Sequence, residues 1–264
     1  MYGKIKQLRD KVLGSKFKLG LALSGGGARG FAHIGALQAM VERKMYPDVI
    51  SGTSAGSIAG ALYADGYAPE EIMELFKKLK FLEFSEFTIP KDGFLKPTKF
   101  RTFLRKHLRA KTFDELQIPL RIIATDIEKG KSCSFSEGDL ISAIIASCSI
   151  PIVFTPTEIN GRHYVDGGLF ANFPVSIIRG ECKTIVGVNV SPTAQRPYSK
   201  SMKYIIERTF NALTTSNAFL DRKLCDILIE SPEISHYSMY DMEEADNIYR
   251  IGYETAVSAL DNQG

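Results

Sequence analysis

Two glycine-rich turns, each placed after a short apolar segment and before a helical one, most constrain the fold of this chain. The first apolar segment, residues 18–24, alternates leucine with small residues and leads into the glycines at 25–30. The second, residues 48–50, leads into Gly-Thr-Ser-Ala-Gly at 52–56, which small residues suited to a helix follow. Strands that stop at glycines and pass into helices are typical of α/β proteins.

The same alternation continues along the chain. Helical patterns cover residues 31–44, 57–64, 69–80, 139–146, 171–178, 200–225 and 243–260, and further strands are predicted over 118–125, 162–165, 184–190 and 227–229. Alternating strands and helices predict an α/β three-layer sandwich with a mostly parallel central sheet and helices on both faces. Ligands of such sheets bind beyond the carboxyl ends of the strands, where both glycine turns fall.

The length of 264 residues, without a linker or an internal repeat, predicts a single domain over residues 1–264. Residues 81–117 are rich in Phe and Lys and are interrupted by Pro90, Gly93 and Pro97, so they predict an insertion or cap without a clear strand. Residues 1–17 are basic and partly amphipathic. They have two interpretations, a helix lying on an anionic membrane or a solvated terminus.

Composition excludes several classes of function. A net charge of only +3, without a basic run that contains aromatic residues, argues against a nucleic-acid partner. The four cysteines lie far apart, with no histidine at metal-ligand spacing, so we expect buried thiols and no metal site. The N-terminus lacks the apolar core of a secretion signal and no uninterrupted apolar span occurs, which predicts a cytoplasmic location.

The second glycine turn fits the pattern G-x-S-x-G, with Ser54 between Gly52 and Gly56. A strand that turns sharply into a helix needs small residues beside the serine, because only a strained backbone exposes its hydroxyl. The predicted strand before it and the small-residue helix after it supply that context. Ser54 is therefore predicted to be a nucleophile, against the alternative of an ordinary Gly/Ser turn.

The first glycine turn has two interpretations. It satisfies G-x-G-x-x-G between a strand and a helix, which is the dinucleotide-binding pattern. That pattern also needs an acidic residue at the end of the second strand, where this chain has Ser51 and Gly52, so we expect no nucleotide. The alternative is an oxyanion hole built from the amides of Gly25, Gly26 and Gly27. Arg29 either holds this loop, attracts an anionic head group or is solvated.

A nucleophilic serine needs a base, and the histidines are weak candidates. Only His236 follows the order of an α/β-hydrolase triad, and it lacks a strand-end context; the others are His33, His107 and His163. Asp166 follows a short predicted strand and precedes Gly167 and Gly168, which permit a tight turn and the close approach of another loop. An Asp-Gly-Gly sequence alone is usually only a turn.

Taken together, these motifs resemble those of the patatin-like phospholipase family, in particular its compact bacterial members. The family has a G-G-G-x-R-G loop, a G-x-S-x-G elbow and a D-G-G motif in that order, as this chain has at 25–30, 52–56 and 166–168. Residues 146–151 and 172–175 also match the segments before and after the D-G-G motif. The resemblance extends over residues 18 to about 190.

The resemblance implies the patatin-like fold and a carboxylic ester hydrolase that uses a Ser–Asp dyad without histidine and without a cofactor. Asp166 would take the Ser54 proton, an acyl-enzyme would form, and the substrate would be a lipid or another acyl ester. A lipid substrate also implies peripheral contact with the inner face of the membrane. Ile152 stands where many members have glycine, and we expect it to narrow the pocket. The alternatives are a non-hydrolytic lipid-binding or regulatory module on the same fold and an acyl-thioesterase.

Overall fold

The computed structural model describes residues 15–78, 86–87, 95–192, 195 and 197–262. Eight strands form one sheet in the order β10-β9-β1-β2-β5-β8-β7, with β6 also paired to β5. The strands are β1 (Phe17–Leu23), β2 (Val49–Thr53), β5 (Leu120–Asp126), β6 (Lys131–Phe135), β7 (Thr157–Ile159), β8 (Arg162–Asp166), β9 (Cys182–Val188) and β10 (Ile227–Ile229). Strands β10, β9, β1, β2 and β5 are parallel, whereas β6 and β8 run antiparallel to β5.

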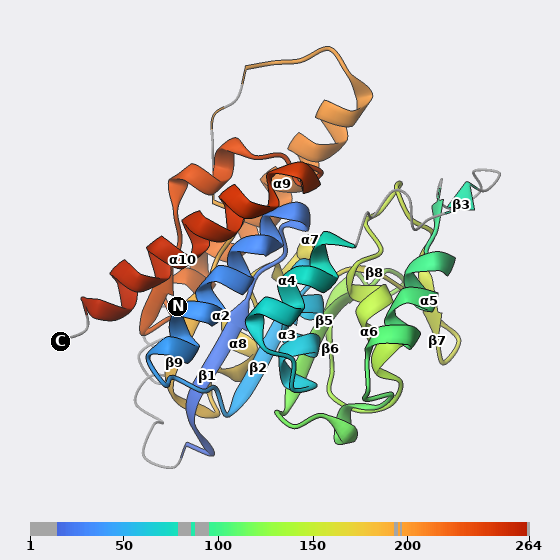
Figure 1. Cartoon of the computed structure of the whole chain (residues 1–264). Coiled ribbons are helices and arrows are strands. Elements are labelled where there is room, and N and C mark those ends of the chain that lie inside the picture. Colours follow the sequence, from blue (N-terminus) through green and yellow to red (C-terminus); the bar gives the residue numbers. More distant parts are fainter. Residues whose placement is uncertain (1–14, 79–85, 88–94, 193–194, 196, 263–264) are drawn as a thin grey trace.

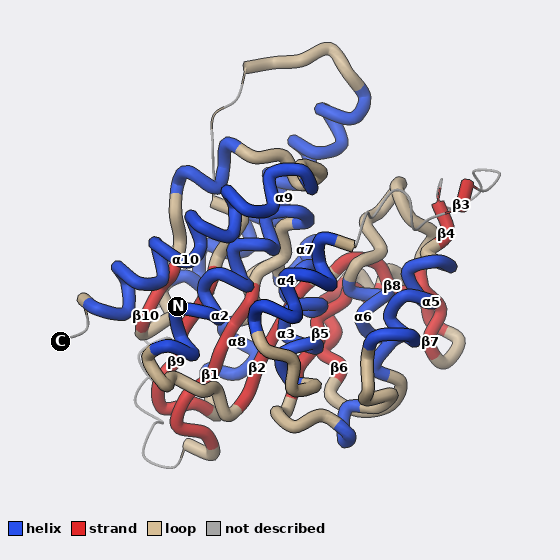
Figure 2. The backbone as a smooth tube through the Cα atoms, viewed as in Figure 1, coloured by secondary structure: helices blue, strands red, loops and turns tan. Residues whose placement is uncertain are grey.

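Helices cover both faces of this sheet (Figures 1 and 2). In β1, Leu21 and Leu23 pack into the larger apolar core and Ala22 packs into a second core on the opposite face, as the alternation of strand side chains requires. The larger core contains residues from α2 (Phe31–Glu42), α3 (Ala55–Ala64), α4 (Pro69–Lys77), α6 (Leu140–Ser147) and α10 (Ala245–Asp261). The second core contains residues from α8 (Val175–Arg179) and α9 (Met202–Arg222). The predicted three-layer α/β fold is confirmed.

The register of β5 brings two strand ends together. Strand β2 pairs with residues 120–123 of β5, and β8 pairs with residues 124–126. Strand β6 pairs with residues 122–126 of β5, a range shared with both β2 and β8, so β6 must occupy the other edge of β5. Strands β2 and β8 therefore lie end to end along one edge, approaching from opposite directions. The residues that follow Thr53 and the end of β8 at Asp166 consequently meet.

The predicted strands and helices of the core are present, with three differences. Strands β6 and β7 were not expected, and the helix predicted over 171–178 is two short helices, α7 (Gly168–Ala171) and α8, on either side of Pro174. Proline lacks the amide that a continuous helix needs. The segment 81–117 was expected to have no clear strand, yet it contains the short paired strands β3 (Glu86–Phe87) and β4 (Leu95–Lys96).

The helix α5 (Thr98–His107) also lies in this segment, and a short 3-10 helix covers Phe113–Glu115. Phe100 and Phe103 of α5 are buried in the larger core, and Arg101 donates a hydrogen bond to Ser142 of α6 at 3.1 Å. These two aromatic residues therefore belong to the core rather than to a cover over the pocket. Of the basic N-terminal segment 1–17, residues 1–14 lie outside the described residues.

Candidate active site

Ser54 occupies a strained turn between β2 and α3. Its φ and ψ are 51° and −121°, a positive φ that residues with a side chain seldom adopt. A Cβ at Gly52 would lie 2.5 Å from the Gly56 carbonyl oxygen, and one at Gly56 would lie 2.3 Å from the Leu23 carbonyl oxygen. Both glycines of the motif are therefore required by close backbone packing. The turn places Ser54 at the N-terminus of α3, whose dipole favours negative charge there.

A hydroxyl from α6 fixes the backbone of this turn. Ser147 Oγ accepts a hydrogen bond from Ser54 N at 2.8 Å and donates one to Ile123 O at 2.6 Å. Ser57 Oγ donates to Ser54 O at 2.7 Å. The main chain around Ser54 is therefore anchored to β5 and α6, and the Ser54 side chain is the part left facing the pocket.

Asp166 ends β8, directly opposite Ala124, and is fully buried. Its Oδ1 accepts a hydrogen bond from Gly168 N at 2.8 Å. Desolvation raises the pKa of Asp166 to about 7, while the Gly168 amide and the Ser54 side chain lower it. Oδ2 forms no hydrogen bond of ordinary geometry within the described residues, although Ser54 is near enough to affect the pKa. We therefore regard Ser54 and Asp166 as adjacent rather than bonded in this resting arrangement.

The two glycines after Asp166 make this approach feasible. A Cβ on Gly167 would lie 2.3 Å from Ile123 O and 3.1 Å from the Thr53 methyl group. One on Gly168 would lie 3.0 Å from both Asp166 Oδ1 and Thr214 Cγ2. A side chain at Gly167 would therefore push the end of β8 away from β5 and the end of β2, and one at Gly168 would crowd the Asp166 carboxylate and α9.

The glycine-rich loop lies beside Ser54, but its three amides are not equivalent. Gly25 N donates to Asn172 O at 3.0 Å, which corrects the expectation that all three glycines donate to an oxyanion. The amides of Gly26 and Gly27 donate to no other part of the described chain. Gly27 has a φ of +60°, and a Cβ there would lie 2.4 Å from Met239 O. The free donors of the loop are therefore Gly26 and Gly27.

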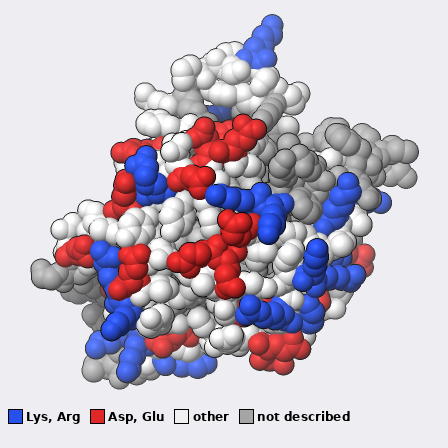
Figure 3. Space-filling view, in the orientation of Figure 1, with Lys and Arg blue, Asp and Glu red and all other residues white. Residues whose placement is uncertain are grey.

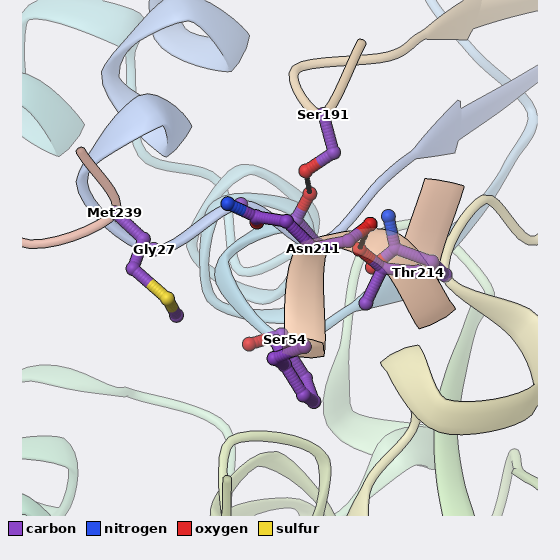
Figure 4. Close-up of a pocket in the computed structure, with 10 residues that line it drawn as sticks. Gly27, Ser54, Ser191, Asn211, Thr214 and Met239 are labelled. Atoms are coloured by element: carbon purple, nitrogen blue, oxygen red, sulfur yellow. Dashed lines mark hydrogen bonds between the residues drawn. The ribbon is translucent and has the colours of Figure 1, made fainter. Parts of the chain in front are cut away.

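These groups surround one pocket (Figure 4). Figure 4 shows Ser54 below, Gly27 and Met239 on the left, Thr214 of α9 on the right, and Asn211 of α9 between them, above Ser54. The residues that line the pocket are Gly25, Gly26, Gly27, Ser54, Asn172, Ser191, Phe210, Asn211, Thr214 and Met239. The structure thus brings the two glycine motifs to one cavity, with the buried carboxyl of Asp166 beside Ser54.

Arg29 is buried rather than solvated, with 2 % of its surface exposed. One of its guanidinium nitrogens donates to Asn211 Oδ1 at 3.0 Å, so Arg29 connects the glycine-rich loop to α9. It does not line the pocket. Of the three roles expected for Arg29, holding the glycine-rich loop in place is the one that fits this position.

None of the four histidines lines the pocket. His33 is buried, and its Nε2 donates to the Ser24 carbonyl oxygen at 2.8 Å. Burial lowers the pKa of His33 to about 4, so the ring is neutral and supports the glycine-rich loop. His163 is exposed and pairs with Glu128, His107 packs against Phe103, and His236 is exposed.

Ile152 corrects one expectation. Its side chain is 58 % exposed and does not line the pocket, so it does not narrow it. Its φ is 72°, a conformation that is costly for a β-branched residue and accessible to glycine. Glycine suits this position because of the backbone conformation and not because of pocket size.

Sequence reasoning assigned no role to Ser147, Asn172 or the residues of α9 in the pocket. Ser147 and Asn172 fall in segments that match the family pattern, which was the available signal. For the residues of α9 the only signal in the sequence was a weaker one, the recurrence of polar side chains along one face of a long helix. That recurrence does not say whether the polar face points inward or outward.

Within the described residues, no group of three or more His, Cys, Asp or Glu side chains is arranged to hold a metal ion. The same part of the chain has no helix with the length and hydrophobicity needed to cross a bilayer.

Comparison with known proteins gives consistent matches. The family model described as patatin-like phospholipase matches residues 21–178. An uncharacterized NTE family protein of Mycobacterium tuberculosis is 32% identical over 207 residues, which cover 77% of this chain and 57% of that protein. Lysophospholipase NTE1 of Saccharomyces cerevisiae is 30% identical over 255 residues, 92% of this chain and 14% of that protein. The chain thus spans little more than half of the mycobacterial relative and a small part of the yeast one.

Among solved structures, VipD from Legionella pneumophila has a TM-score of 0.55 at 15% identity. The alignment covers 94% of this chain and 67% of VipD. At this identity the likeness shows a shared fold.

Proposed function

Because the chain belongs to the patatin-like phospholipase family, we propose that it is a serine acyl hydrolase acting on lipid esters, with Ser54 as nucleophile and Asp166 as base. One observation carries this proposal. The strained Ser54 and the buried carboxyl of Asp166 are adjacent, at a pocket edged by free glycine amides. A carboxyl whose pKa is about 7 is matched to proton transfer at neutral pH.

In the first half of the reaction, Asp166 accepts the proton of Ser54 as Oγ attacks the ester carbonyl carbon. The negative charge that develops on the carbonyl oxygen is stabilised by the amides of Gly26 and Gly27 and by the N-terminus of α3. The C–O bond to the alcohol then breaks, and the alcohol leaves with the proton from Asp166. Ser54 remains acylated.

In the second half, a water molecule attacks the acyl carbon and gives its proton to Asp166. The bond to Ser54 Oγ breaks, Asp166 returns the proton to that oxygen, and the fatty acid leaves. Gly25 is not a donor in this scheme, since Asn172 O occupies its amide. Gly25 and Arg29 instead hold the loop in place.

The substrate we propose is a phospholipid or lysophospholipid, split as a phospholipase A or a lysophospholipase would split it. The names of the yeast relatives, which are lysophospholipases, support this class. The pocket lining includes the apolar side chains of Phe210 and Met239, which suit an acyl chain.

A fluorophosphonate probe tests the nucleophile directly, because it phosphonylates activated serines. We expect rapid labelling of the unmodified chain and none of Ser54→Ala. A panel of phospholipid, lysophospholipid, acylglycerol and acyl-thioester substrates then tests the class. Labelling that persists in Ser54→Ala, or hydrolysis of the thioester alone, would contradict the proposal.

A further inference from the structure

The long helix α9 has the reverse of the usual surface pattern. Its polar residues point inward: Glu207, Asn211, Thr214, Asn217 and Asp221 recur at helical spacing on one face. Asn217 bonds to Asn172 N and Gly168 O, Glu207 accepts from Met239 N, and Asp221 accepts from Ser176 N. Surface helices ordinarily bury their apolar stripe and solvate their polar one.

The opposite face, which we call the outer face of α9, is mostly apolar and is solvent-exposed. Its exposed residues are Met202, Ile205, Thr209, Ala212, Leu213, Ser216, Phe219 and Leu220. Five of the ten large hydrophobic side chains exposed in the described part of the chain lie on this one face. Isolated exposed apolar residues are ordinary, whereas a continuous stripe marks a surface that contacts something apolar.

The helix that carries this outer face also lines the active site. The inward side of the same helix supplies Phe210, Asn211 and Thr214 to the pocket that contains Ser54. Helix α7, which begins two residues after Asp166, packs against α9, and its Phe170 is 50 % exposed. Whatever covers the outer face is therefore held beside the site of hydrolysis.

The charge around the outer face favours a lipid surface. Both acidic residues of α9, Glu207 and Asp221, are on the inward side and are bonded there. Lys200 and Lys223 are exposed at the two ends of the helix, and Lys223 Nζ lies 4.5 Å from the Phe219 ring centroid. Tyr198 packs against Tyr204 at the first end. Lysine and tyrosine at the margins of an apolar stripe are typical of helices that lie in a membrane interface.

At the top of Figure 3, the segment that leads into α9 shows mainly uncharged residues with a basic side chain at its tip. Acidic groups begin directly below this segment in the same view.

We propose that the outer face of α9 docks on the surface of an anionic phospholipid bilayer and holds the Ser54 pocket at that interface. This proposal rests on the proposed function, because a lipid substrate is what a bilayer would supply. It gives α9 two functions, with hydrogen bonds to the catalytic loops on one side and lipid contact on the other.

Flotation with phosphatidylcholine–phosphatidylglycerol vesicles tests the docking surface. The full chain would carry Ser54→Ala, so that lipid turnover does not change the vesicles. Phe219→Glu and Tyr46→Glu form a matched pair, because both remove aromatic side chains of similar exposure, 54 % and 58 %, and add the same charge. Tyr46 precedes β2 and Ser54 follows it, so the two residues lie at opposite ends of this strand.

We expect the parent chain to float and Tyr46→Glu to float equally, within about twofold. Phe219→Glu should lower the partition coefficient by about tenfold, since an apolar contact is replaced by a charge that anionic lipid repels. Leu213→Glu repeats the test away from the Lys223 contact, and unchanged melting temperatures confirm folding.

Equal flotation of Phe219→Glu and Tyr46→Glu, or no flotation of the parent chain, would overturn the docking surface. Sedimentation velocity tests the alternative that a second copy of the chain covers the outer face. If the parent chain does not float and is a dimer that Phe219→Glu dissociates, the outer face joins two copies instead. Hydrolysis of a water-soluble monomeric ester tests the proposed function separately. If Ser54→Ala loses none of that hydrolysis while vesicle binding still depends on Phe219, the catalytic proposal fails and the docking surface stands.

Discussion

The two long C-terminal helices, α9 and α10, are arranged in opposite ways. Helix α10 buries Ile248, Ile251, Ala256 and Leu260 against α2 and exposes the ion pair of Arg250 with Glu254. Helix α9 turns hydrogen-bonding side chains such as Glu207 and Thr214 inward. It exposes five large apolar side chains, Met202, Ile205, Leu213, Phe219 and Leu220. The first arrangement stabilises the fold. The second arrangement buries less apolar surface, but it connects the helix by hydrogen bonds to the loops around Ser54. This indicates that α9 contributes to the active site more than to the stability of the core.

The largest expected effect is on ester hydrolysis, at the proposed catalytic pair beside the pocket that α9 lines. Ser54→Ala and Asp166→Asn should each lower the hydrolysis of a soluble ester by roughly 10³-fold or more, because a nucleophile and its base act as one unit. Neither should lower the melting temperature, because neither change creates a cavity. Steady-state kinetics and thermal melts check both statements.

His236→Ala is the control for this prediction, since His236 is exposed and does not line the pocket. It should retain nearly all activity. A folded His236→Ala chain as inactive as Ser54→Ala would indicate a triad and leave Asp166 without its proposed role.

Truncation of an apolar side chain should give different results in the two helices. Ile248→Ala in α10 should lower the free energy of unfolding by about 2–5 kcal/mol, because it leaves a cavity in the larger core. Leu213→Ala on the outer face of α9 should change it by less than about 0.5 kcal/mol. Urea denaturation measures both. Similar losses in the two variants would mean that the outer face of α9 is covered in the isolated protein.

The pKa of Asp166 predicts opposite effects of pH on activity and on stability. Activity should fall about tenfold per unit below pH 7, as the base becomes protonated. Because burial raises the pKa above its unfolded value, the protonated form is favoured in the folded state. The stabilisation from this group is complete below pH 4 and is lost as pH rises toward 7.

Denaturation from pH 4 to pH 8, with Asp166→Asn as reference, isolates this contribution, since asparagine does not titrate. If the two stability curves stay parallel over that range, the carboxyl is not desolvated as the structure indicates.

The smallest effect concerns the backbone strain at Ile152. Ile152→Gly should raise the free energy of unfolding by about 1 kcal/mol, because it relieves a β-branched residue at positive φ. Ile127→Gly is the control, since Ile127 is comparably exposed and is absent from the residues with positive φ. It should be destabilising. A fall in the melting temperature of both variants would contradict the assigned strain.

The local features of the site could be predicted from sequence because each depends on a backbone requirement. Gly52 and Gly56 identified the serine turn, since close backbone contacts exclude side chains at both positions. Which amides of the glycine-rich loop are free to donate hydrogen bonds could not be predicted from the sequence. The amide of Gly25 is occupied by Asn172, which is 147 residues away in sequence, and no local pattern records that contact.

Local sequence patterns were sufficient to predict the core strands, most of the helices, the turn at Ser54 and the glycines that flank it. These follow from local periodicity and from the steric limits on side chains. The tertiary structure alone brings β2 and β8 end to end on β5, which places Asp166 beside Ser54. It also decided the orientation of α9. Helical periodicity defines a polar and an apolar face, but which face turns inward depends on the loops that the helix contacts.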